Sequence, residues 1–177
     1  MQNKKTMPIA ILCVMGMLTA MEVVLERVVA INVLTFKINL AFIPMAVAAY
    51  LYGPVGGAVV YGLGDIIGTL LFPVGAYNPL FTLTNVLIGI LYGLCLRGEL
   101  KIWKIAIGPI IARTVGTLGL NALWIYIFFI KGKKGYWAFL LTRVPEAAIM
   151  LTAELIILIP LFMGCRNWLN HLKYSKT

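Results

Sequence analysis

A single carboxylate in the middle of an apolar segment points most directly to chemistry in this sequence. Asp65 lies within the glycine-rich segment 55–72, and Thr82 and Asn85 come early in the next apolar segment, 80–96. A carboxylate at membrane depth is costly unless it is paired or hydrated, so its presence there indicates a functional site. The structural alternative is that Asp65 only caps a neighbouring helix or pairs with a buried arginine.

Basic, amide and aromatic side chains occur at corresponding depths of the other apolar segments. We expect them to converge on one pocket, in which basic groups and amides bind an anionic ligand and aromatic rings stack on its planar ring. The candidate substrate-binding residues are Arg27, Lys37, Asn39, Asp65, Tyr77, Phe81, Thr82, Asn85, Asn121, Trp124 and Arg143. Asn121 and Trp124 are three residues apart and are expected to share a helix face. Each residue also has a structural alternative, because Trp and Tyr form interface belts and Thr and Asn hydrogen-bond between helices.

Sequence motifs for catalysis, metal binding and nucleic-acid binding are absent. The sequence contains no P-loop, HExxH, CxxC or GxSxG motif, and its cysteines, Cys13, Cys95 and Cys165, lack the spacing of metal ligands. No basic patch is interleaved with aromatic residues in the manner of a nucleic-acid site. We therefore expect no enzyme activity, no metal, no cofactor and no nucleic-acid partner.

Composition places the chain in the membrane. Hydrophobic residues make up 62% of the 177 residues, charged residues 12%, and the mean hydropathy is +0.96. A soluble domain carries roughly twice that charged fraction. Long apolar runs rather than short alternating ones favour helices over a barrel. The sequence predicts an all-α integral membrane protein that is surrounded by lipid.

The apolar runs predict one transmembrane domain, residues 1–177, with a compact bundle of six helices. The first run is too long for a signal-peptide core and is expected to remain in the mature protein. Pro44 is expected to kink the second helix, Gly53-Pro54 to make a turn, and Pro109 to interrupt the fifth helix. The expected helices are residues 8–29, 38–51, 55–72, 80–96, 102–130 and 138–163.

The distribution of lysine and arginine predicts the orientation. These residues are more numerous in the N-terminus, the loop after the fourth helix and the C-terminus than in the opposite loops. The positive-inside rule then places both termini in the cytoplasm of a multi-pass cell-membrane protein. The basic loop Lys131–Lys134 is an exception on the outer side, and it would attract an anionic solute.

One face of the first helix has the spacing of a helix-docking surface. Gly16 and Ala20 are four residues apart, so both small residues lie on one side of the helix. Small residues at this spacing allow another helix backbone to approach closely. We expect a partner protein to dock there.

Several stretches together resemble a known family. They are GPVGGAVVYGLGDIIGTLLFPVGAYNPLFTLTNVLIGILYGL at 53–94, LERVV at 25–29, NLAFIP at 39–44, LNALW at 120–124 and LLTRVPEAAIM at 140–150. The chain resembles the substrate-binding (S) component of energy-coupling factor (ECF) vitamin transporters, in particular the folate-specific family. The family often has Ala-xxx-Ala where this chain has Gly16 and Ala20. It also more often has an aromatic residue at Asn78 and a small one at Leu80.

The resemblance implies a fold, a ligand and partners. It implies a six-helix bundle that captures folate from outside, with the connectors between helices 1 and 2 and between helices 3 and 4 acting as gates. It also implies association with a membrane coupling protein and two cytoplasmic ATPases, and rotation of the loaded bundle when it docks.

Two alternatives remain at this point. The first is an S component for another vitamin, such as riboflavin, thiamine or a queuosine precursor. Folate has two carboxylates, so Arg27, Lys37 and Arg143 should matter for folate and less for a neutral ring. The second is a structural membrane subunit, which would not need Asp65 or Asn121 at membrane depth.

Overall fold

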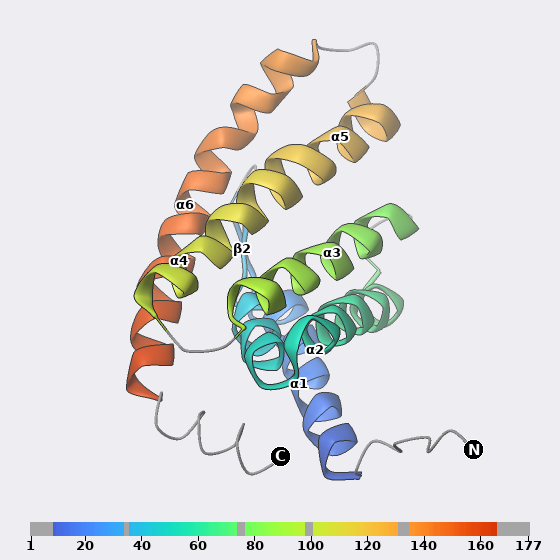
Figure 1. The fold of residues 1–177 in the computed structure, drawn as a ribbon. Helices are drawn as coiled ribbons and strands as arrows, with labels where there is room; N and C mark the ends of the chain where they lie inside the picture. Colours follow the sequence, from blue (N-terminus) through green and yellow to red (C-terminus); the bar gives the residue numbers. More distant parts are fainter. Residues whose placement is uncertain (1–8, 34–35, 74–76, 98–100, 131–134, 166–177) are drawn as a thin grey trace, which may run out of the picture.

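The described part of the chain is helical apart from one small hairpin, as the computed structural model shows (Figure 1). The structure describes residues 9–33, 36–73, 77–97, 101–130 and 135–165, with only the backbone described at 31–33, 36–38 and 129–130. The elements are α1 (Ile9–Arg27), β1 (Ile31–Val33), β2 (Phe36–Ile38), α2 (Phe42–Leu71), α3 (Pro79–Cys95), α4 (Ile102–Ile111), η1 (Ala112–Asn121), α5 (Ala122–Ile125), η2 (Tyr126–Ile130) and α6 (Tyr136–Gly164).

Within the described residues, four helical stretches are long and apolar enough to cross a membrane. They are α1, α2, the continuous run from α4 to Phe128, and α6, and the shorter α3 is also apolar. Large apolar side chains such as Leu12, Leu70 and Trp137 are exposed on their outer faces. In water such a surface would be unfavourable, whereas in lipid it faces a matching solvent. The prediction of an all-α membrane protein is confirmed.

The helix α2 changes direction once along its length. Gly53 has a φ of 72° and a ψ of −160°, a conformation that residues with a Cβ rarely adopt. Pro54 follows as the first residue of the next helical stretch, where its missing N–H is not needed. The predicted helices 38–51 and 55–72 therefore correspond to the two sides of this turn.

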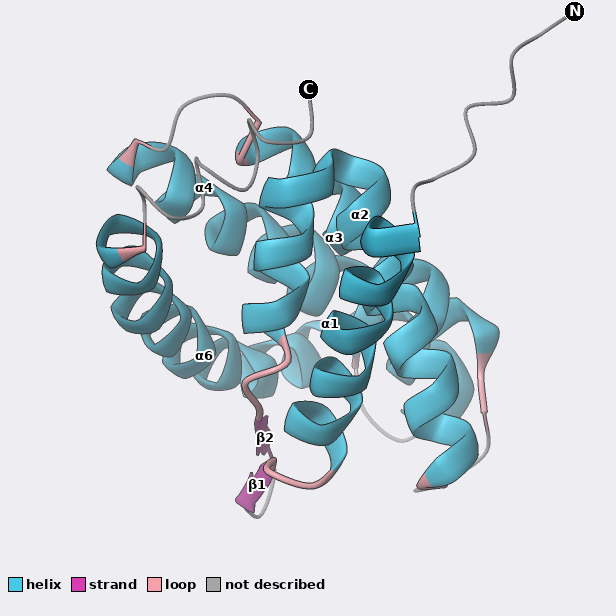
Figure 2. Ribbon diagram, turned by 90° about the horizontal axis from the view of Figure 1, so that it is seen from below, coloured by secondary structure: helices cyan, strands magenta, loops and turns pink. Residues whose placement is uncertain are grey.

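The segment before α2 differs from the prediction. A helix was expected from residue 38, but Phe36–Ile38 is a strand paired antiparallel with Ile31–Val33, and α2 begins at Phe42 (Figure 2). Isoleucine, valine and phenylalanine favour extended backbone, and the hairpin satisfies their backbone groups with each other. The expected kink at Pro44 is also absent, because this residue lies in the first turn of α2, where its N–H would have no partner anyway.

The fifth predicted helix forms one continuous run with changing hydrogen bonds. After Pro109 the α-helical pattern of α4 gives way to the i→i+5 pattern of η1, as in the bond from Ala122 N–H to Thr117 O. Proline removes one backbone donor, and a π-turn is one way in which the ladder continues past it. The helical run therefore continues past Pro109 into η1 and α5.

The chain forms two halves that differ in their packing (Figure 1). We call α1–α3 the N-terminal half and the run from α4 to α6 the C-terminal half. In the N-terminal half, α2 packs closely on α3, because a Cβ added at Gly57 would lie 2.5 Å from Gly89 O, and one at Gly89 would lie 2.4 Å from Gly57 O. In the C-terminal half, α6 packs mainly on α4 and η1.

A core of buried apolar residues joins the two halves at one end. Phe42, Met45 and Tyr50 of α2 and Tyr92 of α3 belong to the same buried cluster as Phe162 of α6. The rings of Tyr50 and Phe162 meet edge to face, with centroids 5.8 Å apart. This cluster closes the bundle below the cavity described next.

Candidate ligand-binding site

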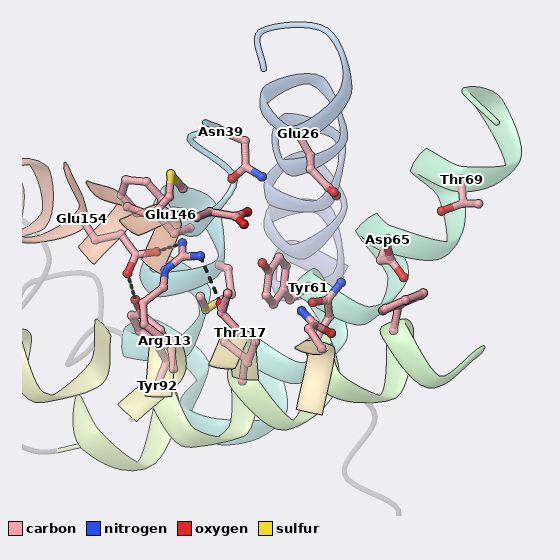
Figure 3. A pocket seen from close by; sticks show the side chains of 18 of the residues that line it. Glu26, Asn39, Tyr61, Asp65, Thr69, Tyr92, Arg113, Thr117, Glu146 and Glu154 are labelled. Atoms are coloured by element: carbon pink, nitrogen blue, oxygen red, sulfur yellow. Dashed lines mark hydrogen bonds and ion pairs between the residues drawn. The ribbon is translucent and has the colours of Figure 1, made fainter. Parts of the chain in front are cut away.

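A cavity of about 360 Å³ lies between the two halves. This is within the size range of small-molecule sites. Residues from α1, α2, α3, η1, α5 and α6 surround it, together with three residues outside the helices (Figure 3). Its lining consists of Glu26, Arg27, Asn39, Phe42, Met45, Tyr61, Asp65, Thr69, Tyr77, Asn78, Phe81, Asn85, Ile88, Tyr92, Ala112, Arg113, Thr117, Asn121, Ile125, Arg143, Glu146, Met150 and Glu154.

The wall from the N-terminal half holds an arginine through a shared carboxylate. Arg27 Nη2 donates to Asp65 Oδ1 at 3.4 Å and to Thr69 Oγ1 at 2.8 Å. The second carboxylate oxygen, Asp65 Oδ2, accepts from Thr82 Oγ1 at 2.6 Å. The Thr82 hydroxyl is in turn 3.0 Å from Tyr77 Oη. Both oxygens of Asp65 therefore have partners, and an arginine beside it offsets the cost of a carboxylate at membrane depth.

Two glycines of α2 make room for the polar side chains of α1. A Cβ at Gly64 would lie 1.6 Å from Glu22 Oε2, and a Cβ at Gly68 would lie 2.9 Å from Arg27 Nε. The glycines at this four-residue spacing therefore leave room for charged side chains, in addition to allowing close helix packing. Glu22 is fully buried, and neither of its carboxyl oxygens has a hydrogen-bond partner among the described residues.

The wall from the C-terminal half contains a second arginine–carboxylate pair. Arg113 of η1 forms an ion pair with Glu154 of α6, whose other oxygen accepts from Tyr92 Oη of α3 at 3.3 Å (Figure 3). Arg113 Nη1 also lies 3.4 Å from Thr117 Oγ1. The side chain of Glu154 is only 2% exposed, so the pair is a buried one. It connects three helices at this side of the cavity.

A third pair lies on α6 itself. Arg143 Nη1 donates to Glu146 Oε2 at 2.8 Å, across the three-residue spacing that the sequence contains. The Arg143 guanidinium also lies over the ring of Phe139, 5.4 Å from its centroid. Both members of the pair line the cavity and are partly exposed.

This arrangement suits a ligand that carries both a hydrogen-bonding ring and negative charge. The three arginines supply donors for carboxylates, and each also has a carboxylate partner in the lining. Asn121 lines the cavity, and its buried Oδ1 has no hydrogen-bond partner among the described residues, so its capacity as an acceptor is unused there. Figure 3 shows Tyr61 between the Arg113–Glu154 side and the Asp65–Thr69 side.

Most of the predicted site residues line the cavity. Those that do so are Arg27, Asn39, Asp65, Tyr77, Phe81, Asn85, Asn121 and Arg143. Thr82 is outside the lining and bonds to two residues within it. The side chain of Lys37 lies outside the described part of the structure.

Trp124 is also outside the lining, although it lies three residues from Asn121. Its Nε1 donates to Thr84 Oγ1 of α3 at 3.2 Å, whereas Asn121 lines the cavity. Residues 122–125 are α-helical, so the helix type does not account for the difference. The hydrogen bond to Thr84 instead holds the indole against α3.

The sequence interpretation missed several residues that line the cavity. Arg113 and Glu154 carried the same signal as Asp65, since each is a charge inside an apolar segment. Glu26 and Glu146 are also charged residues of such segments. Tyr61 and Tyr92 carried no signal, because a tyrosine in an apolar helix is unremarkable.

The predicted docking face of α1 is open. Gly16 and Ala20 are exposed, and a Cβ added at Gly16 would meet no atom within 4 Å.

Among the described residues, no group of three His, Cys, Asp or Glu side chains is placed to hold a metal ion.

Comparisons with known proteins agree on one family. The model of the family described as "ECF transporter, substrate-specific component" matches residues 11–162. A protein named folate transporter FolT from Clostridium novyi is 27% identical over 145 residues, which cover 81% of this chain and 83% of the relative. A protein of the same name from Leuconostoc mesenteroides is 27% identical over 141 residues, or 77% of this chain and 75% of the relative.

A solved structure matches the fold over a similar length. It is described as the crystal structure of FolT bound with folic acid, and it matches with a TM-score of 0.75 and 26% sequence identity. The match covers 84% of this chain and 88% of the other.

Proposed function

This chain belongs to the family of substrate-specific components of ECF transporters, and we propose that it binds folate. The observation that supports this most strongly is the match to a structure of FolT with folic acid, over most of both chains. The two curated relatives carry the same name. The role expected of such a component is capture of the vitamin, not catalysis.

The lining of the cavity supports the same ligand. Folate combines a hydrogen-bonding pteridine ring, a benzoyl ring and a glutamate with two carboxylates. Arg27, Arg113 and Arg143 offer donors for carboxylates, and Tyr61, Tyr77 and Phe81 offer aromatic faces. Asn39, Asn85 and Asn121 offer amide groups for the ring edge.

The test is equilibrium binding to the purified chain in detergent, without ATP. Calorimetric titration with folate is expected to show tight binding of one ligand per chain, whereas riboflavin and thiamine are expected to show none. A folded sample that binds riboflavin or thiamine but not folate would replace the ligand and keep the family. Native mass spectrometry of the co-purifying ligand would then identify it.

We also propose that the loaded chain delivers folate by docking on separate energising subunits. These are a membrane coupling protein and two cytoplasmic ATPases, which fits the absence of a P-loop in this sequence. The open face at Gly16 and Ala20 would receive the coupling protein, since small residues let helices approach closely. We propose that both termini lie in the cytoplasm and that the hairpin β1–β2 lies on the outer side, and the lysine and arginine distribution supports this orientation.

A bulky substitution on the docking face separates binding from delivery. Ala20→Trp is expected to leave folate affinity unchanged and to abolish uptake by cells that contain the energising subunits. Ala148→Trp places the same bulk on an exposed position of α6 and is the matched control, with uptake expected near the wild-type level. Normal uptake by the Ala20→Trp variant would rule out the proposed face.

A further inference from the structure

Thr82 lies outside the cavity, yet its hydroxyl bonds to two residues that line it. Thr82 Oγ1 donates to Asp65 Oδ2 at 2.6 Å and lies 3.0 Å from Tyr77 Oη. An ionised carboxylate only accepts, so the Thr82 proton goes to Asp65 and Tyr77 donates to the Thr82 oxygen. The hydroxyls of Tyr77 and Thr82 and the carboxylate of Asp65 therefore form a chain with a fixed direction. We call these three groups the hydroxyl relay.

The end of the relay anchors Arg27. Asp65 Oδ1 and Thr69 Oγ1 both accept from Arg27 Nη2, and the longer contact with Glu26, 3.9 Å, uses the same nitrogen. Among the described residues, Nη2 makes all the polar contacts of this guanidinium. Nη2 is thus fixed against α2, and Nε is buried beside Gly68. Nη1 is the guanidinium nitrogen left to donate to an anion.

We propose that Thr82 and Asp65 are positioning residues for ligand binding, with Thr82 holding both the Tyr77 ring and the carboxylate that orients Arg27. The ligand carboxylate is then bound by Arg27, and its ring lies against Tyr77. The inference rests on the proposed function, since folate carries both groups. It differs from the sequence interpretation, in which Asp65 and Thr82 contact the ligand themselves.

Burial makes the relay sensitive to one hydroxyl. Thr82 is 8% exposed and Asp65 is 7% exposed, so water does not readily replace a lost bond. Thr82→Val keeps the shape of the side chain and removes both hydrogen bonds. Thr82→Ser keeps the hydroxyl and removes one methyl group.

The first experiment measures folate affinity by calorimetry. Thr82→Val is expected to bind about ten-fold more weakly than wild type, whereas Thr82→Ser is expected to stay within about two-fold. The control is Thr84→Val, which removes a buried hydroxyl that bonds to Leu80 O and Trp124 instead of to residues of the cavity. Unchanged affinity in Thr82→Val, or an equal loss in Thr84→Val, would overturn the proposal.

The second experiment tests whether Tyr77 and Thr82 act as one unit. Tyr77→Phe removes the Tyr77 hydroxyl, which is one partner of the hydrogen bond that Thr82→Val also removes. The double variant is therefore expected to bind folate no more weakly than Thr82→Val alone. Losses that simply add would show two independent residues and overturn the relay.

The same cycle on the ligand-free protein separates the relay from the choice of ligand. The two substitutions are expected to lower the melting temperature less than additively, because both remove one bond. Absence of such coupling would overturn the relay. Failure of the wild-type protein to bind folate would overturn the proposed function, but the coupling measured on the ligand-free protein would still stand.

Discussion

Both walls of the cavity contain an arginine–carboxylate pair, but the two walls hold it differently. In the N-terminal half, Asp65 shares its oxygens between Arg27 and Thr82, on helices that approach at glycines. In the C-terminal half, Arg113 and Glu154 form a buried ion pair between η1 and α6, beside the apolar contacts of the core cluster. In the first wall, the helices α2 and α3 meet through backbone contact at glycines. In the second wall, a buried ion pair is part of the contact between helices.

The difference teaches where each half is vulnerable. A buried pair contributes little net stability, but removal of one partner leaves a charge buried alone. Close packing at glycine has the opposite weakness, because an added methyl group has no room. We therefore expect the free energy of unfolding to fall most when a charge is removed from the C-terminal half or when bulk is added at the glycines of the N-terminal half.

The largest effect is expected from Glu154→Leu. This change leaves Arg113 in the wall without its carboxylate, and we expect a loss of about 3 kcal/mol in the free energy of unfolding. Denaturant unfolding in detergent would measure it. Glu146→Leu on the same helix is the matched control, since its partly exposed pair with Arg143 is worth less than about 1 kcal/mol.

A double variant then tests the explanation. Arg113→Met together with Glu154→Leu removes both charges, and most of the lost stability is expected to return. If the double variant is as unstable as Glu154→Leu, the buried charge is not the cause.

The next effect concerns binding rather than stability. Arg27→Gln keeps a polar side chain but removes the guanidinium and its charge, and we expect folate affinity to fall about 30-fold, or about 2 kcal/mol. Arg143→Gln is expected to lower it less, because that side chain lies on α6 with its own partner, Glu146, and over Phe139. Calorimetry on both variants gives the ranking, and an Arg143 effect that exceeds the Arg27 effect would contradict it.

A glycine substitution tests the packing of the N-terminal half. Gly89→Ala would place a methyl group 2.4 Å from Gly57 O, so α3 must move away from α2, with an expected loss of about 1.5 kcal/mol. Gly16→Ala is the control in the opposite direction, because its site is open and alanine favours helix by roughly 0.5–1 kcal/mol. Equal melting temperatures for the two variants would argue against backbone contact as the basis of this half.

The sequence predicted the fold class and several polar residues of the N-terminal wall, in part because charge in an apolar segment is a local signal. Asp65 and Arg27 stood out in this way, and the glycines beside them indicated close packing. The resemblance to a family added the ligand class and the partners. None of this required knowledge of which helices meet.

The C-terminal wall was harder to predict because its features depend on partners far apart in the sequence. Arg113 and Glu154 were seen as charges, but their pairing depends on how η1 and α6 pack. The hairpin at residues 31–38 is another example, since short apolar runs fit a strand or a helix equally well. The i→i+5 hydrogen bonds after Pro109 likewise have no clear sequence pattern.

Trp124 gives the smallest and most specific test of the comparison, because it connects the two halves without lining the cavity. Its Nε1 donates to Thr84 Oγ1, so Trp124→Phe removes one hydrogen bond between α5 and α3 and keeps an aromatic ring. We expect a loss of about 1 kcal/mol in stability and folate affinity within two-fold of wild type. Phe81→Leu, which removes a ring that does line the cavity, is expected to weaken binding several-fold. A large loss of affinity in Trp124→Phe would instead place the indole against the ligand, and the hydrogen bond to Thr84 would then not be its main role.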